Sequence, residues 1–403
     1  MKRISFRRLA AVSAACGFFV FSARVDSARR PRYGGTLRVE IGSVVTTLDP
    51  NLRAANSEEG AAKEQLDALL YETRDAAGKY RADSAGGAFR MTEWEPGKHA
   101  VFVANENYRG GRPFVDSIAI DMGRPGRDRL LDLELNKTDL AEIPVEQIRL
   151  AAERGVRVSA SNPAELIAVI FTAGDRATQK DRRVREAFSR SIDRAAIVNF
   201  ILQKQGEPAG GLLPQWSNGT AFLFSTETRG AKEVLGKNGD SPKIVLGYDS
   251  GDALEQAIAE RILVNAREAG ISLTTQPISG GGTDTSSLLK GIGSKGIVAQ
   301  AIDAKMIRWR MPSSDPRESL ESFLDMFGTF VTTASNDADA LPDNASPQQI
   351  YERELGVVSG FQVVPLVWIP RVYGVSARVR DWSAPTPGET LPLADVWLDG
   401  EAP

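Results

Sequence analysis

Apolar residues spaced three and four positions apart predict a pair of helices near the middle of the chain. The first covers residues 182–191, and Asp181 is a suitable N-cap for it. The second follows Asp193, which can cap it, and runs over residues 194–203 until a Gly- and Pro-containing run ends it. The apolar faces of the two helices consist of Val184, Ala187 and Phe188, then of Ile197, Phe200 and Ile201.

The rest of the chain alternates between strand and helix patterns. Leu37, Val39 and Ile41 alternate with polar residues, which predicts a half-buried strand. Further strands are expected over residues 115–121, 156–160, 243–248, 271–275 and 360–370, and helices over residues 57–71, 127–135, 145–154 and 254–266. Alternation at this spacing indicates βαβ units in a largely parallel sheet, so the predicted fold class is α/β. Polar, glycine- or serine-rich runs at 279–287, 291–296 and 332–346 are expected to be loops.

Length and the N-terminal segment add an expectation about organisation and location. With 403 residues, the chain suits two lobes rather than one ordinary core. Basic residues precede a short apolar run and then small residues, so residues 1–28 are expected to be a secretory signal peptide and the location periplasmic or extracytoplasmic. A lipid anchor at Cys16 is the less favoured interpretation, because Ser13 replaces the usual Leu and the apolar run continues past the cysteine.

Composition argues against several classes of function. Loss of residues 1–28 removes five basic and one acidic residue from a formal net charge of −3, which leaves −7 and disfavours nucleic-acid binding. His99 is the only histidine, so the Ser-His and Cys-His pairs of hydrolases are excluded and no metal site is expected. The βα turns carry no dinucleotide or P-loop glycine pattern, and no cofactor is expected. The chain is not expected to be an enzyme.

Three segments carry a family resemblance. They are GGTLRVEIGSVVTTLDP at 34–50, VREAFSRSIDRAAIVNFILQKQGEPAGGLLP at 184–214 and WRMPSSDPRESLESFLDMFG at 309–328. Together they resemble the family 5 solute-binding proteins, the ligand-capturing subunits of ABC importers. The resemblance implies a two-lobed periplasmic-binding-protein type II-like fold with a hinge. The interval 51–87 is too short for the extra N-terminal subdomain of full-length relatives, which is expected to be reduced or absent.

The resemblance also implies a domain layout and a function. Lobe I is expected at 29–171, lobe II at 172–366, and a return to lobe I at 367–403. The protein would be an exported, monomeric substrate-binding subunit that captures a small organic ligand, with oligopeptides among the candidates, and delivers it to ABC permease subunits in the membrane. The alternative is a shortened relative without transport function that acts as an interaction or sensory partner of a membrane protein.

Candidate ligand-binding residues follow from the same motifs. Trp309 could be an apolar wall of the cleft, but the third residue after it, an aspartate that pairs with the peptide amine in peptide-binding relatives, is here Pro312. A missing charge-assisted hydrogen bond is worth about 1.5–3 kcal/mol. The full candidate set is Trp309, Arg310, Asp315, Thr46, Thr47 and Trp216. The structural alternatives are core packing of Phe323, Leu324 and Phe327 in the same motif, a helix N-terminus for Asp315, a solvated strand edge for Arg310, and a partly buried loop position for Trp216.

Overall fold

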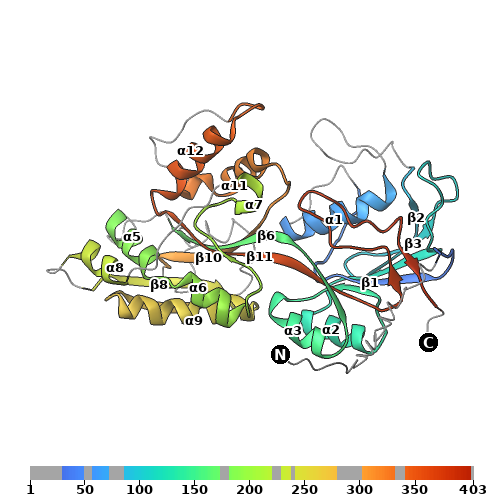
Figure 1. Cartoon of the computed structure of the whole chain (residues 1–403), viewed down its shortest axis with the longest axis horizontal. Helices are drawn as coiled ribbons and strands as arrows, with labels where there is room; N and C mark the ends of the chain where they lie inside the picture. Colours follow the sequence, from blue (N-terminus) through green and yellow to red (C-terminus); the bar gives the residue numbers. More distant parts are fainter. Residues whose placement is uncertain are drawn as a thin grey trace, which may run out of the picture. The chain divides into compact units, whose positions relative to one another are not determined.

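The structure is a computed structural model of the chain (Figure 1). It describes residues 30–49, 57–71, 86–172, 181–219, 228–236, 241–278, 302–331 and 341–400, and Arg32–Pro403 form one compact unit. The predicted signal peptide, the predicted loops at 279–287 and 291–296, and residues 332–340 lie outside these ranges. Among the described helices, none combines the length and apolar character that a membrane span requires.

Strands and helices alternate along the chain largely where the sequence predicts them. The strands are β1 (Thr36–Glu40), β2 (Phe89–Glu95), β3 (His99–Ala104), β4 (Ser117–Asp121), β5 (Leu140–Glu142), β6 (Arg157–Phe171), β7 (Glu207–Pro208), β8 (Lys243–Asp249), β9 (Ser272–Ile278), β10 (Ala304–Arg310), β11 (Val363–Val375), β12 (Val379–Arg380) and β13 (Trp397–Leu398). The helices are α1 (Ser57–Leu70), α2 (Gly126–Glu134), η1 (Val145–Gln147), α3 (Ile148–Glu153), α5 (Arg182–Ser191), α6 (Arg194–Ala196), η2 (Ile197–Ile201), α7 (Gln215–Asn218), α8 (Thr228–Leu235), α9 (Ala253–Glu268), α11 (Pro316–Val331) and α12 (Pro347–Val358).

One mixed sheet runs through the molecule in the order β2-β3-β4-β1-β5-β11-β6-β10-β8-β9, with β7 paired to β11. Its two ends have parallel cores: β1 pairs in parallel with β4 and β5, and β8 pairs in parallel with β9 and β10. We call the part built on β1–β5 with α1–α3 the first lobe, and the part built on β8–β10 with α5–α12 the second lobe. The α/β, two-lobed prediction is confirmed.

Two long antiparallel strands, β6 and β11, join the lobes. The sequence predicts a strand only over residues 156–160, whereas β6 continues to Phe171. At the middle of this pair Pro163 lies opposite Pro370, and the register shifts on both sides of Pro370. Prolines and register shifts weaken a ladder, so this is the most deformable part of the join. The lobe boundaries at 171 and 366 stay a prediction.

The hydrophobic core is divided on one face of the sheet and continuous on the other. The first-lobe core contains Leu66 and Leu69 of α1, and the second-lobe core contains Phe323 and Phe327 of α11. The shared core runs along β6 and β11 and connects α2 and α3 to α5 and α9. Figure 1 shows α1, α11 and α12 on one side of the sheet and α2, α3 and α9 on the other. A ligand site between the lobes is therefore expected on the α1 and α11 side.

The predicted helix pair is present with one change. The side chain of Asp181 caps α5 by accepting from the Arg183 N–H at 2.9 Å, as predicted. Asp193 likewise caps α6, but the chain then forms a π-helical turn over Ile197–Ile201. The wider turn moves Phe200, which lies within it, off the predicted apolar face, and this side chain is 80% exposed instead of buried.

Candidate functional site

The carboxyl ends of strands from both lobes meet at the join. β5 ends at Glu142, which lies opposite Tyr373 of β11, and β10 ends at Arg310, which lies opposite Glu165 of β6. Because Glu165 itself lies opposite Ile369, the two strand ends face each other across only a few residues of β11. Open α/β sheets bind ligands outside the carboxyl ends of their strands. The register of the sheet thus gives the position of the candidate site.

Three arginines and three carboxylates form a central charge cluster at this position: Arg308, Arg310, Arg371, Glu142, Glu165 and Asp252. Glu165 accepts from Arg308, and its second oxygen lies 3.1 Å from Arg310 Nε. Arg308 also reaches Asp252 Oδ2 at 2.5 Å in the second lobe. Glu142 of the first lobe lies 3.3 Å from Arg371 Nη2 and 3.5 Å from Arg310 Nη2.

The arginines keep the two glutamates ionised. Burial opposes ionisation of Glu142, but the charges of Arg371 and Arg310 outweigh it and hold the pKa of that carboxyl well below its ordinary value. Burial likewise opposes ionisation of Glu165, and Arg308 and Arg310 lower its pKa below the ordinary value. The pairing connects Glu142 of the first lobe with Arg310 of the second, and the formal charges of the cluster balance.

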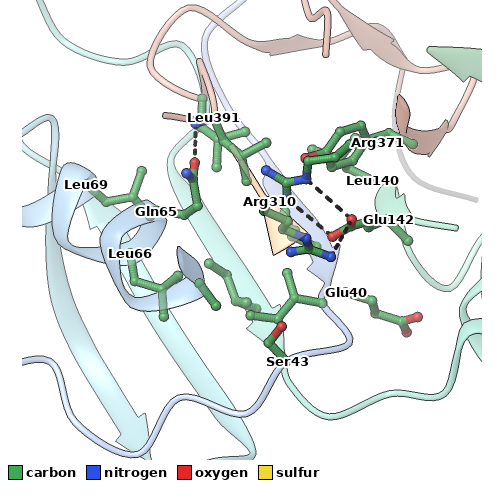
Figure 2. A pocket seen from close by; sticks show the side chains of 17 residues that line it. Glu40, Ser43, Gln65, Leu66, Leu69, Leu140, Glu142, Arg310, Arg371 and Leu391 are labelled. Atoms are coloured by element: carbon green, nitrogen blue, oxygen red, sulfur yellow. Dashed lines mark hydrogen bonds and ion pairs between the residues drawn. The ribbon is translucent and has the colours of Figure 1, made fainter. Parts of the chain in front are cut away.

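Two adjoining cavities lie beside the charge cluster, and both are lined by Gln65, Arg310 and Arg371. The first cavity lies between α1 and the ends of β1 and β5, and Figure 2 shows Leu66, Leu69 and Gln65 on one side and Arg310 and Glu142 on the other. The second cavity lies between α1, the segment that follows β10 and the segment 385–389. The cavity volumes are about 30 and 70 Å³. Ligand pockets usually measure about 300–1,000 Å³, so a ligand of peptide size requires the lobes to separate.

The structure places Trp309 in the second-lobe core. Its side chain is 2% exposed, and its ring packs edge-on against Phe323 at 5.2 Å and Trp368 at 6.1 Å. The expectation that this ring forms an open wall of the cleft is therefore wrong. The physical reason is strand alternation: Trp309 points to the α11 side, whereas its neighbours Arg308 and Arg310 reach the charge cluster.

Asp315, Thr46 and Thr47 line neither cavity. The exposed Asp315 carboxylate accepts from the N–H groups of Arg317 and Glu318, at 2.8 and 3.2 Å, at the start of α11. Thr46 donates from its N–H and hydroxyl to Glu59 at 2.7 and 2.6 Å, and the Thr47 hydroxyl accepts from the Asp49 N–H at 3.2 Å. All three have local structural roles here, and ligand contact by them stays a prediction.

Of the remaining candidates, only Arg310 lines the cavities. Trp216 is partly buried and donates from its indole N–H to the Pro163 carbonyl at 2.8 Å, so it packs beside the proline of the lobe join. Sequence reasoning missed Glu142, Arg371 and Tyr373. The sequence analysis predicts no strand at 140–142, and only the pairing of β5 with β11 brings Glu142 beside Tyr373.

The described residues contain no group of three or more histidine, cysteine, aspartate and glutamate side chains placed to hold a metal ion. His99, the sole histidine, is at the start of β3, where its Nδ1 lies 2.7 Å from Asp121 Oδ1. The site as described thus consists of a charge cluster and two small cavities with apolar and polar walls.

Comparisons with known proteins show what this chain is similar to. The model of the "Bacterial extracellular solute-binding proteins, family 5 Middle" matches residues 47–330, more than half of the chain. The probable D,D-dipeptide-binding periplasmic protein DdpA of Escherichia coli is 26% identical over 212 residues, which cover 51% of this chain and 41% of DdpA. The nickel-binding periplasmic protein of Escherichia coli is 21% identical, with 51% of this chain and 43% of that protein covered. The matches span only about two fifths of the length of these curated relatives.

Solved structures show the same fold. The oligopeptide-binding protein AppA of Bacillus subtilis, in complex with a nonapeptide, superposes with a TM-score of 0.68 at 14% identity, covering 92% of this chain and 100% of AppA. The substrate-binding protein CtaP of Listeria monocytogenes gives 0.72 at 13% identity, covering 91% and 100%. The motifs of the sequence, the two lobes joined by β6 and β11, and the family match lead to one conclusion: this chain belongs to family 5 of the bacterial extracellular solute-binding proteins.

Proposed function

We propose that this protein is the exported substrate-binding subunit of an ABC importer, and that it captures a small organic ligand between its lobes and delivers it to a membrane permease. It would act as a monomer and without catalysis. The observation that carries the proposal is the meeting of β5 and β10 at the two cavities, with Arg310 and Arg371 in the walls of both. Ligand would enter when the lobes separate at the weakened part of β6 and β11.

Short peptides are the first ligand class to test, because DdpA and AppA are named for dipeptides and oligopeptides. The exposed Pro312 lines the second cavity, so the carboxylate expected from the resemblance is missing from that wall. Two other carboxylates, those of Glu64 and Glu389, line the same cavity. A peptide amine would meet these groups instead, and affinity would depend less on a single ion pair.

The variant Pro312→Asp tests the position of the peptide. If a peptide amine approaches the second cavity, the added carboxylate should raise the affinity for a short peptide about tenfold by calorimetry. N-acetylation of the peptide should abolish that gain. Ser314→Asp is the matched control, because Ser314 is exposed on the same segment and lines neither cavity. Equal gains in both variants would indicate a general charge effect and contradict this placement.

Lobe closure and delivery need separate measurements. Small-angle scattering should show a smaller radius of gyration when a bound peptide closes the lobes, and affinity capture from membranes should recover permease subunits. If peptide mixtures produce neither compaction nor a thermal shift, ligand capture is refuted.

The small cavities and Pro312 also support a second candidate, a shortened relative that acts as an interaction or sensory partner of a membrane protein. Recovery of a sensor kinase without permease subunits would favour this second function.

A further inference from the structure

The hydroxyl of Tyr373 has no hydrogen-bond partner within the part of the chain that the structure describes. The residue is only 3% exposed and lines the first cavity. A buried hydroxyl without a partner costs about 1–3 kcal/mol, and buried polar groups are nearly always paired. An unpaired hydroxyl in a cavity wall suggests that a bound molecule supplies the missing hydrogen-bond partner.

The Tyr373 ring is held in position by its neighbours. Trp382 packs edge-on at 5.1 Å between ring centroids, and the guanidinium carbon of Arg371 lies 5.4 Å from the Tyr373 centroid. Burial raises the pKa of Tyr373 above its ordinary value, against the lowering effect of the Arg371 charge. The phenol therefore stays protonated at neutral pH and is available as a donor.

The rest of the first cavity indicates the kind of group that it accepts. Its wall is mostly aliphatic: Val39, Ile41, Ala62, Leu66, Leu69, Ile120, Leu140, Ala141, Leu391 and Leu393. Gln65 lines the same cavity and uses its Oε1 to accept from the Leu391 N–H at 2.6 Å, which leaves its NH₂ group as a donor (Figure 2). Donors beside an aliphatic wall suit an apolar group that carries an oxygen acceptor.

We infer that the first cavity is a subsite for an aliphatic group next to a carbonyl or carboxylate oxygen, and that this oxygen accepts a hydrogen bond from Tyr373. An aliphatic residue of a short peptide has this chemistry, either through its internal carbonyl or through the terminal carboxylate. The inference rests on the proposed function, since lobe movement has to withdraw Arg310 of β10 from the cavity wall before such a residue fits. It makes Tyr373 a residue that determines ligand specificity.

The experiment compares the wild type with Tyr373→Phe, which removes only the hydroxyl. Calorimetric titration with Gly-Gly-Leu should show an affinity about fivefold lower for the variant, as expected for one neutral hydrogen bond. Gly-Gly isopentylamide, which keeps the aliphatic side chain and the internal carbonyl but lacks the terminal carboxyl group, distinguishes the two oxygens: it keeps the fivefold difference if the internal carbonyl is the acceptor and loses it if the terminal carboxylate is. Gly-Gly-Gly should bind more weakly than Gly-Gly-Leu to both proteins, because it leaves the aliphatic wall uncovered. Tyr108→Phe is the control, since Tyr108 packs against the first-lobe core but lines neither cavity.

The thermal stability of the unliganded variant provides an independent readout. Removal of an unpaired hydroxyl should leave the melting temperature unchanged or raise it, whereas loss of a structural hydrogen bond lowers it. A clearly lower melting temperature, or equal Gly-Gly-Leu affinities for wild type and Tyr373→Phe, would overturn the inference. Failure of all three peptides to bind the wild type would instead refute the peptide proposal, and this inference with it.

Discussion

The central charge cluster predicts a large effect of one substitution, Glu165→Gln. Glu165 has a side chain that is 6% exposed, and its two oxygens accept from Arg308 and Arg310. Removal of one partner from a buried ion pair costs about 3–5 kcal/mol, because a charge is left without compensation. Glutamine keeps one acceptor oxygen and Arg308 keeps Asp252, so the expected loss is near the lower end, about 3 kcal/mol.

Urea unfolding followed by far-UV circular dichroism measures this loss as a change in the free energy of unfolding. The control is Glu153→Gln, which removes an ion pair with Arg149 on the surface of α3, where both side chains are more than half exposed and 2.8 Å apart. An exposed pair contributes at most about 1 kcal/mol. If the two variants lose equal free energy, the charge cluster does not stabilise the join between the lobes.

Two further predictions concern residues with structural roles. Asp315→Ala should lower the free energy of unfolding by about 1 kcal/mol, because α11 loses its cap. Unchanged peptide affinity by calorimetry would leave Asp315 with this structural role alone, and a large loss of affinity would identify it as a ligand residue. Burial raises the pKa of Glu354 to about 7, against the lowering effect of the Leu213 and Leu212 N–H groups. The folded protein then holds a proton that the unfolded chain, with an ordinary pKa of about 4.3, has released, so stability falls as the pH rises from about 4.5 to 7. The melting temperature of the wild type, relative to that of Glu354→Gln, should therefore fall between pH 5 and pH 8, and a constant difference would contradict the assigned cause.

The elements that were predicted correctly depend on short-range rules. A helix such as α5 is determined by its cap and by contacts three and four residues apart, and both are visible in the sequence. The length of β6 was not visible, because Pro163 and Glu165 interrupt the apolar pattern that marks a strand. The exposure of Phe200 was missed because a π-helical turn leaves no local signature that periodicity can detect.

The candidate site was harder to predict because its residues are distant in sequence. Glu142 and Arg371 are 229 positions apart, and only the pairing of β5 with β11 brings them into contact. Trp309 was assigned to the cleft because an aromatic residue in a ligand motif and one in a core look alike until the direction of each strand residue is known. Arg310, its neighbour, lines both cavities, and ligand binding by it stays a prediction.

The shared core along β6 and β11 restricts how the protein can open. Apolar side chains of α2 and α3 are continuous there with those of α5 and α9, so pulling the lobes apart on that side would expose them to water. On the α1 and α11 side the core is already divided between the lobes, so separation there breaks no continuous apolar core. The lobes should consequently separate only on the α1 and α11 side. A ligand would approach and leave by that side, which carries Gln65 and Pro312.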